Sequence, residues 1–286
     1  MEKKSKGCVW AYHGSKIRYL DNILEVIPDK WKEYRVIDLF SGGSSVATNL
    51  PDKWIVTAND QEDRVINFSV WLQNMLQFNT PEEVEEIVRN HCRTHISSRE
   101  DKEGYDLLKQ RYNNGDRTPL NLYALTMSSN SNMIRFNKSG AQTLQFGKRY
   151  YNENTKKKML NYLNNLKDKK IDFLSEDYTF FSGVLKDKFD IWVIDPAYRT
   201  SKATYSENGQ WTLQDEVNIM KLCDDIEQAG KKFIYFNQTF TQDVENKPVN
   251  IWKDKYNHLV LKDTTTNCSA QRKNKGKTVE LMVHNF

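Results

Sequence analysis

The sequence contains little cysteine and no long apolar run. Its 286 residues include only four cysteines, at positions 8, 92, 223 and 268, and none of them forms a Cys-x-x-Cys pair. We therefore expect neither a disulfide framework nor a zinc ribbon. No apolar stretch approaches the roughly 18 residues of a membrane span, and no signal-peptide core of about 7 to 15 apolar residues follows the basic start. These absences indicate a soluble protein in a reducing, cytoplasmic setting.

Two nucleotide-binding motifs are also absent. The chain has neither a Gly-x-Gly-x-x-Gly turn nor a Gly-x-x-x-x-Gly-Lys-[Ser/Thr] loop, so neither a dinucleotide nor a nucleoside triphosphate is indicated. His91, Cys92 and His95 lie within one turn of an expected helix. No further pair of ligands has suitable spacing, so we expect no metal site there.

Positive charge is concentrated in one segment. The formal net charge is only +4, yet residues 131–170 contain ten Lys or Arg against two acids. In 156–170, apolar residues recur at helical spacing between lysines, which is typical of a solvated amphipathic helix. The preceding stretch, SNMIRFNKSGAQTLQFGKRYY, mixes Arg, Asn and aromatic residues around turn signals and predicts a hairpin. Arg and Asn form paired hydrogen bonds with guanine and adenine edges, so this hairpin is a candidate for contact with nucleic acid.

The order of apolar patterns predicts an α/β protein. Helical spacing is found over 14–28 and 213–230, and 61–130 is mostly helical in pattern. This last region interrupts the alternation of strand and helix. We infer an α/β sheet with an inserted helical and hairpin domain. The strand-like runs are RVID (35–38), WIVTAND (54–60), IDFL (171–174), FDIWVID (189–195), KKFIYFN (231–237), HLVL (258–261) and TVELMVHNF (278–286).

Three acids, Asp38, Asp60 and Asp195, come at the ends of expected strands. In open α/β sheets, ligands bind at the carboxyl ends of the strands, so we expect these acids to line one crevice. Gly42 and Gly43 follow the first strand and allow the backbone to approach a ligand. An acid at the end of the second strand suits ribose hydroxyls, because a carboxylate accepts hydrogen bonds from both. Such a turn also occurs for purely structural reasons, so alone it leaves both interpretations open.

Five motifs stand in order along the chain: AYHGSK (11–16), VIDLFSGGSSV (36–46), TAND (57–60), SNMIRFNKSG with FGKR (131–149), and IDPAY (194–198). In order and approximate spacing they resemble the DNA adenine-N6 methyltransferases of the Dam type, including those of T-even phages. The similarity covers essentially the whole chain. Five ordered motifs are far more specific than any one of them.

The resemblance implies a Rossmann-like methyltransferase sheet, S-adenosylmethionine as cofactor, S-adenosylhomocysteine as product, and no metal. The cofactor-binding residues that it implies are Tyr12, Gly14, Lys16, Asp38, Phe40, Ser41, Gly42, Gly43, Asp60, Tyr178 and Asp195. The catalytic residues that it implies are Asp195, Pro196 and Tyr198, in the tetrapeptide that the family usually writes Asp-Pro-Pro-Tyr.

The resemblance also implies double-stranded DNA as the partner, with no membrane and no obligate protein partner. It divides the chain into a catalytic domain, 1–61 with 153–286, and a target-recognition domain, 62–152. The implied target is the adenine of GATC, although Gln145 stands where the family usually has proline before FGKR. Roles in restriction–modification, repair marking or regulation stay open. The implied DNA contacts are Met133, Arg135, Asn137, Lys148 and Arg149.

The chemistry explains why an acid, a proline and a tyrosine follow an apolar strand. The adenine amino group is a poor nucleophile because its lone pair is delocalised into the ring. If Asp195 and the Pro196 carbonyl each accept one N6 hydrogen, the lone pair is directed toward the methyl donor. Tyr198 would then stack on the base. A base inside a duplex cannot enter such a pocket, so we expect the target adenine to be flipped out.

One position departs from the family. Ala197 replaces the second proline, which removes rigidity and adds an N–H, and we expect activity to be kept at an equal or lower level. Two alternatives stay open: a methyltransferase acting on RNA or another nucleobase, and a DNA-binding relative that does not transfer methyl groups. The segment 199–210 reads either as a loop that closes over the flipped base or as an ordinary exposed loop. The aromatics Trp192, Tyr205 and Trp211 fit either a core or a pocket wall.

Overall fold

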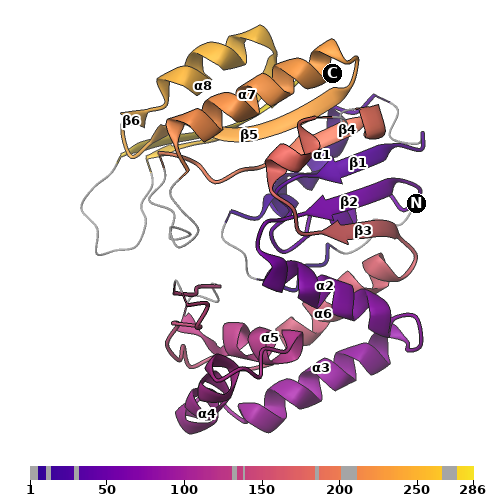
Figure 1. The fold of residues 1–286 in the computed structure, drawn as a ribbon, viewed down its shortest axis with the longest axis vertical. Coiled ribbons are helices and arrows are strands. Elements are labelled where there is room, and N and C mark those ends of the chain that lie inside the picture. The colour runs from indigo at the N-terminus through magenta and orange to yellow at the C-terminus, as the bar shows by residue number, and fades with distance from the viewer. Residues whose placement is uncertain are drawn as a thin grey trace. The chain divides into compact units, whose positions relative to one another are not determined.

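The computed structural model describes residues 6–10, 14–28, 32–130, 134–137, 139–183, 187–200, 211–265 and 276–286. These residues divide into two compact units. Unit 1 comprises Met1–Leu20 with Ser41–Glu176, and unit 2 comprises Asp21–Phe40 with Asp177–Phe286. Figure 1 shows the elements of both. None of the helices in the described part of the chain has the length and apolar character that crossing a membrane requires.

Unit 2 is built on a mixed sheet in the strand order β1-β4-β5-β8-β7. The strands β1, β4 and β5 run parallel, whereas β8 is antiparallel to both β5 and β7. The short β6 pairs with the end of β5. The strands are β1 (Arg35–Asp38), β4 (Ile191–Ile194), β5 (Lys232–Thr241), β6 (Val244–Glu245), β7 (Asn257–Thr265) and β8 (Lys277–His284). The helices are α1 (Leu20–Glu25), η4 (Tyr178–Phe181), α7 (Leu213–Gln228), α8 (Lys247–Trp252) and η7 (Lys253–Lys255).

The core of unit 2 forms between this sheet and α7. All four residues of β4 are buried, as expected for a parallel strand covered on both faces. The helix α7 starts at a capping box between Thr212 and Asp215 and presents a buried stripe, which includes Ile219, Cys223 and Ile226, to the core. Figure 1 shows α7 and α8 lying along β5, with which both make contact. The carboxyl end of β4 is therefore held on a rigid support.

In its described residues, unit 1 combines two parallel strands with five α-helices and two 3-10 helices. The strands are β2 (Ile55–Asn59) and β3 (Lys170–Leu174), paired in register from Ile55 with Lys170 to Asn59 with Leu174. The helices are η1 (Lys16–Tyr19), η2 (Ala47–Asn49), α2 (Asp63–Met75), α3 (Pro81–His95), α4 (Lys102–Asn113), α5 (Pro119–Ser128) and α6 (Glu153–Lys167). The predicted α/β class is confirmed by the parallel strands and their helices in both units.

The helices of unit 1 pack around α5. Its residues Leu122, Tyr123 and Leu125 are all buried, as expected for a helix that is apolar on every side. The helices α2, α3 and α4 each contact α5, and α6 contacts α3. Of the predicted basic helix over 156–170, α6 has a buried face that includes Met159 and Leu163, and it ends at Lys167. Its lysines at 157, 158 and 167 are exposed, whereas Lys169 lies after the helix end and is buried.

Three details differ from the sequence-based expectation. The helix predicted over 14–28 starts as the 3-10 helix η1 and ends at Glu25. The helix α8 and the strand β6 were not predicted. The expected hairpin forms only isolated antiparallel bridges, Ser129 with Phe146 and Phe136 with Gln142, among its described residues. The predicted division into catalytic and target-recognition domains stays a prediction.

Candidate active site

Asp60 is the centre of a hydrogen-bonded turn in unit 1. It follows β2, and its backbone N–H donates to the Leu174 carbonyl at 3.2 Å. One carboxylate oxygen accepts from the Gly42 N–H at 2.7 Å and the other from the Glu62 N–H at 2.9 Å. Burial raises the pKa of Asp60 above its ordinary value, and the two backbone donors act in the opposite direction. The carboxylate is thereby fixed in orientation at the end of the strand.

The loop from Ser41 to Ser44 places Gly42 beside Asp60. The Ser41 N–H donates to the Asn59 carbonyl at 2.7 Å, and the Ser44 N–H donates to the Ser41 carbonyl at 2.7 Å. Gly42 has a φ of 49°, in the left-handed region that glycine adopts without strain. A Cβ on Gly43 would lie 3.0 Å from the Cβ of Trp10. Gly42 therefore serves the backbone conformation of this turn and Gly43 its close packing, and the predicted approach of a ligand to the turn stays a prediction.

Lys16 is buried and turned back on its own chain. Its ammonium donates to the Gly14 carbonyl at 2.8 Å, and Gly14 has a φ of 84°. Ser15 bonds through its hydroxyl to that of Ser45 at 2.7 Å, which ties this segment to the loop after Gly43. The segment of Gly14 and Lys16 is thus linked to the loop that follows the turn at Gly42. The predicted contact of Tyr12 lies outside the described residues.

Phe40, Tyr178 and Trp211 form an aromatic cluster in unit 2. The ring centroids are 5.7 Å apart for Phe40 and Tyr178, 5.7 Å for Phe40 and Trp211, and 5.8 Å for Tyr178 and Trp211. All three side chains are only partly buried against the core. The indole N–H of Trp211 has no hydrogen-bond partner among the described residues. The cluster offers aromatic faces and one unused donor to a planar ligand.

The tetrapeptide after β4 carries a hydrogen bond between its first and last side chains. The Tyr198 hydroxyl lies 3.1 Å from Asp195 Oδ1 and 3.3 Å from Glu280 Oε1. Burial raises the pKa of Tyr198 well above its ordinary value, and the two carboxylates raise it further. The phenol therefore stays protonated, and its one O–H group donates a hydrogen bond that the two acids share. Pro196 is buried, whereas Ala197 is exposed.

Arg199 anchors the chain directly after the tetrapeptide. Its Nε donates to Glu216 Oε2 and its Nη2 to Asn246 Oδ1, each at 3.1 Å. Glu216 is fully buried on α7 and also accepts from Asn246 Nδ2 at 2.7 Å. A hydrogen-bonded network centred on a buried carboxylate fixes backbone position. It holds the end of the tetrapeptide against α7.

The hairpin (residues 129–149) displays the predicted DNA contacts in different ways. Lys148 and Arg149 are exposed, and Arg135 is half-buried. Asn137 Oδ1 accepts from the N–H of Ser139 at 3.0 Å and of Ala141 at 2.9 Å, so the side-chain oxygen shapes the turn. Among the described residues the Asn137 amide N–H groups make no hydrogen bond, so they are candidates for contact with a base. Met133 lies outside the described residues.

Gly147 has a structural reason within the hairpin. A Cβ there would come within 2.4 Å of the Ser129 backbone, and its N–H donates to the Ser128 carbonyl at 2.8 Å. Only glycine allows the two chain segments to approach this closely. The glycine of the FGKR motif therefore places Lys148 and Arg149 at the edge of the hairpin.

The structure brings together some predicted residues and leaves others apart. Gly42 contacts Asp60 directly in unit 1, and Tyr198 contacts Asp195 in unit 2. Asp38 is buried as the last residue of β1. Since Asp38 and Asp195 belong to one unit and Asp60 to the other, a common crevice for the three stays a prediction.

Glu280, Arg199 and Glu216 were missed as candidate site residues. Glu280 is an acid in an otherwise apolar strand, TVELMVHNF, and Glu216 is an acid on the buried side of α7. A charged residue at an apolar position is a signal that a partner lies nearby. The sequence does not reveal which partner, because Tyr198 is 82 residues away from Glu280.

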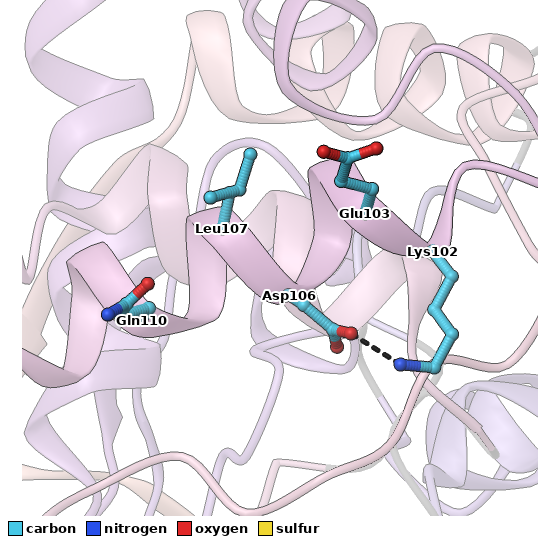
Figure 2. A pocket seen from close by; sticks show the side chains of 5 residues that line it. All are labelled: Lys102, Glu103, Asp106, Leu107 and Gln110. Carbon is cyan, nitrogen blue, oxygen red and sulfur yellow. Dashed lines mark hydrogen bonds and ion pairs between the residues drawn. The ribbon is translucent and has the colours of Figure 1, made fainter.

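Two other features carry no active-site chemistry. His91 donates through Nε2 to Asn121 Oδ1 at 2.8 Å, and burial lowers its pKa, so it serves as a neutral tie between α3 and α5. An open hollow of about 450 Å³ lies along one face of α4. Figure 2 shows the side chains that line it and the ion pair that joins Lys102 to Asp106. The lining side chains all come from one exposed helix face and converge on no buried group.

The chain is similar to modification enzymes of bacteria. It is 24% identical to the type II methyltransferase M.FokI of Planomicrobium okeanokoites over 96% of this chain and 42% of that protein. It is likewise 24% identical to the modification methylase StsI of Streptococcus sanguinis, over 96% of this chain and 42% of that protein. The modification methylase LlaI of Lactococcus lactis subsp. lactis is 24% identical over 87% of this chain and 38% of its own length. The chain thus spans about two fifths of each relative.

Similarity to solved structures is weak. The rRNA methyltransferase aviRa of Streptomyces viridochromogenes has a TM-score of 0.40 at 13% identity, covering 99% of this chain and 93% of that one. A SAM-dependent methyltransferase of Agrobacterium tumefaciens has a TM-score of 0.39 at 12% identity, covering 94% of this chain and 60% of that one.

Most of the chain matches one protein family. The family described as D12 class N6 adenine-specific DNA methyltransferase matches residues 12–267. The matched region includes the turn at Gly42, Asp60, the hairpin and the tetrapeptide at Asp195. The predicted resemblance to adenine-N6 DNA methyltransferases is therefore confirmed. The chain belongs to the D12 class of N6 adenine-specific DNA methyltransferases.

Proposed function

We propose that this protein transfers a methyl group from S-adenosylmethionine to N6 of an adenine that is flipped out of duplex DNA. One observation carries the proposal. The Asp-Pro-Ala-Tyr tetrapeptide stands directly after the parallel strand β4, and its Asp195 carboxylate lies 3.1 Å from the hydroxyl of Tyr198. The ends of parallel strands are where α/β sheets bind ligands. An acceptor fixed at this point suits the amino group of a base.

In each unit, taken by itself, residues suit one part of S-adenosylmethionine. Each oxygen of Asp60 accepts one backbone N–H, and a carboxylate has about four acceptor positions, so acceptors remain for two ribose hydroxyls. Phe40, Tyr178 and Trp211 supply partly exposed aromatic faces for an adenine ring. The indole N–H of Trp211 has no partner among the described residues, so it is a candidate donor to a ring nitrogen of that adenine. When bound, the cofactor supplies an electrophilic methyl group on its sulfonium sulfur.

The protein's own residues prepare the adenine. Asp195 and the Pro196 carbonyl each accept one N6 hydrogen, which turns the nitrogen lone pair toward the incoming methyl group. Tyr198 stacks on the flipped base, and its high pKa keeps the phenol neutral beside the two acids. Flipping costs a few kcal/mol of unstacking, which contacts with the extruded base offset.

The hairpin reads the DNA sequence in this proposal. Arg135 and Arg149 suit paired hydrogen bonds to guanine, and the Asn137 amide N–H groups suit an acceptor on a base. Lys148 is exposed at the hairpin edge and suits a phosphate. GATC is the proposed target, on the resemblance of RFN and FGKR to the Dam-type motifs. Of the whole molecule's possible roles, restriction–modification is the one that the similar modification enzymes support.

The proposal is tested by expressing the protein in a host that lacks adenine methylation and sequencing modified bases in a co-resident plasmid. We expect N6-methyladenine at one short motif, GATC, on both strands. Methylation at another motif would retain the activity and correct the specificity. No DNA methylation, together with label transfer to RNA, would assign the enzyme to RNA. No transfer to either, with DNA binding intact, would identify a non-catalytic relative.

A further inference from the structure

Arg64 stands where three parts of unit 1 meet. It lies in the first turn of α2, and its guanidinium carbon is 3.4 Å from the ring centroid of Phe136 in the hairpin. The same guanidinium holds the Glu62 carboxylate with two donors, Nε on one oxygen and Nη2 on the other at 2.6 Å. One side chain therefore joins the hairpin to the segment that follows β2.

From Glu62 the contacts continue into the proposed cofactor site. The Glu62 N–H donates to Asp60 Oδ1 at 2.9 Å, and Asp60 Oδ2 accepts from the Gly42 N–H at 2.7 Å. An unbroken series of contacts thus runs from the Phe136 ring through Arg64, Glu62 and Asp60 to the glycine turn. It starts in the predicted target-recognition domain and ends in the predicted catalytic domain.

The geometry of this series is restrictive. Glu62 is the N-cap of α2 and also accepts from the Arg64 N–H at 3.3 Å, so both charged groups are fixed to the helix start. The exposed fractions of the Arg64 and Glu62 side chains are only 27% and 13%. A paired guanidinium–carboxylate contact away from solvent is strong and directional.

Phe136 is held as firmly on the hairpin side. It is 5% exposed, bridges to Gln142, and stacks on Tyr112 of α4 at 6.4 Å with an interplanar angle of 28°. The attraction between a cation and an aromatic face is stronger where little water reaches the pair, and here the Phe136 ring is buried. Movement of the hairpin at Phe136 therefore moves Arg64, and movement of Arg64 disturbs the carboxylate that is bonded to the Asp60 segment.

We propose that Arg64 is a positioning residue that couples DNA binding at the hairpin to cofactor binding at Asp60. The inference rests on the proposed function. Arg135 and Asn137 flank Phe136 in the chain, so DNA bound to them orders the hairpin against Arg64. The cofactor orders Asp60 from the other end, and each ligand reduces the ordering left for the other. Such coupling is reciprocal and typically amounts to about 5- to 150-fold in affinity.

The test uses calorimetry to measure binding of S-adenosylhomocysteine, which cannot donate a methyl group. Binding is measured with and without duplex DNA that carries the motif the enzyme methylates. In the wild-type protein, saturating DNA tightens cofactor binding at least about fivefold. In Arg64→Ala, cofactor binding persists, and the tightening by DNA falls to less than about twofold. The reverse titration, DNA affinity with and without S-adenosylhomocysteine, loses the same factor because the coupling is reciprocal.

Three further variants sharpen the result. Arg64→Lys keeps the positive charge but loses the planar, bidentate contact with Glu62, so most of the coupling should be lost. Phe136→Leu interrupts the series at the hairpin end, so it should also lose the coupling. It replaces Arg64→Ala as the test if that variant fails to fold. Lys102→Ala removes an exposed ion pair of the same unit on α4 (Figure 2), which has no contact to this series among the described residues, and leaves the coupling unchanged.

Two outcomes overturn the inference while the proposed function stands. One is a wild-type enzyme that methylates DNA and shows no coupling between the two ligands. The other is full coupling in both Arg64→Ala and Phe136→Leu. A wild-type protein that binds neither S-adenosylhomocysteine nor S-adenosylmethionine removes the proposed function itself, and this inference with it.

Discussion

Glu280 is expected to set the rate of methyl transfer through Tyr198. The Tyr198 hydroxyl lies 3.1 Å from Asp195 Oδ1, an oxygen that the amino group of adenine needs, and 3.3 Å from Glu280 Oε1. When adenine arrives, the phenol can transfer its hydrogen bond wholly to Glu280 and release Asp195. In Glu280→Gln the second acceptor loses its charge and becomes weaker. The variant therefore keeps the shape of the site and impairs this release.

The magnitude follows from the two kinds of hydrogen bond. A bond to a charged acceptor contributes about 1.5–3 kcal/mol and a bond to a neutral one about 0.5–1.5 kcal/mol. The 3.3 Å separation favours the low end, so the change costs about 1 kcal/mol, or about fivefold in kcat. KM for the cofactor should not change, because Glu280 acts on the Tyr198 hydroxyl.

The assay is steady-state methyl transfer to a short duplex, with denaturant unfolding to verify that Glu280→Gln is folded. Tyr198→Phe is the matched background, since it lacks the hydroxyl through which Glu280 acts. In that background Glu280→Gln should have no further effect on kcat. An equal loss with and without the hydroxyl, or no loss in the wild-type background, would refute the reasoning.

The remaining predictions concern cofactor binding, DNA recognition and Ala197, the tetrapeptide residue that differs from the family. The pKa of Asp60 is raised, and ribose hydroxyls need its charged form. Cofactor affinity should therefore be highest at high pH and should fall on acidification at a higher pH than it would with an Asp of ordinary pKa. The same pH profile in a binding titration of Asp60→Asn would contradict this. Arg149→Ala should weaken discrimination by about 1–3 kcal/mol in competition binding, whereas equal loss on cognate and random DNA would indicate a phosphate contact. Ala197 is exposed, so Ala197→Pro should leave kcat equal or higher, and a severe drop would show that alanine is needed there.

The sequence predicted the strands and the positions that follow them. The apolar runs at β1, β2 and β4 are short, and each ends at an acid, which is preceded by an asparagine after β2. The apolar pattern and the polar residue that ends it therefore both indicate a strand. The turn at Gly42 could be predicted because glycine and the acid after β2 are both local signals. Contacts across long separations could not be predicted, and the Tyr198–Glu280 contact is one of them.

The hairpin was predicted in place and not in form. Turn signals identified the chain reversal, yet the Asn137 side chain forms several hydrogen bonds to its own turn and only isolated bridges hold the rest. A side chain that bonds the nearby backbone competes with a regular ladder. The sequence pattern shows Asn as a candidate reader of bases, and only the structure shows that its oxygen is used elsewhere.

Arg64 illustrates a second limit of sequence reasoning. Its spacing from Glu62, two residues along a helix start, has no pattern that indicates a paired contact. Phe136 is 72 residues further along the chain and reads as one of many aromatics. Their meeting depends on how α2, α4 and the hairpin pack, which is a property of the folded unit.

The central claim is that Asp195 prepares the adenine amino group for methyl transfer. The most direct measurement is mass spectrometry of nucleosides from duplex DNA after incubation with S-adenosylmethionine and either wild-type protein or Asp195→Ala. We predict N6-methyladenine with the wild-type protein and none with the variant, while the variant still binds the cofactor within a few fold. Equal amounts of N6-methyladenine from both proteins would contradict the account.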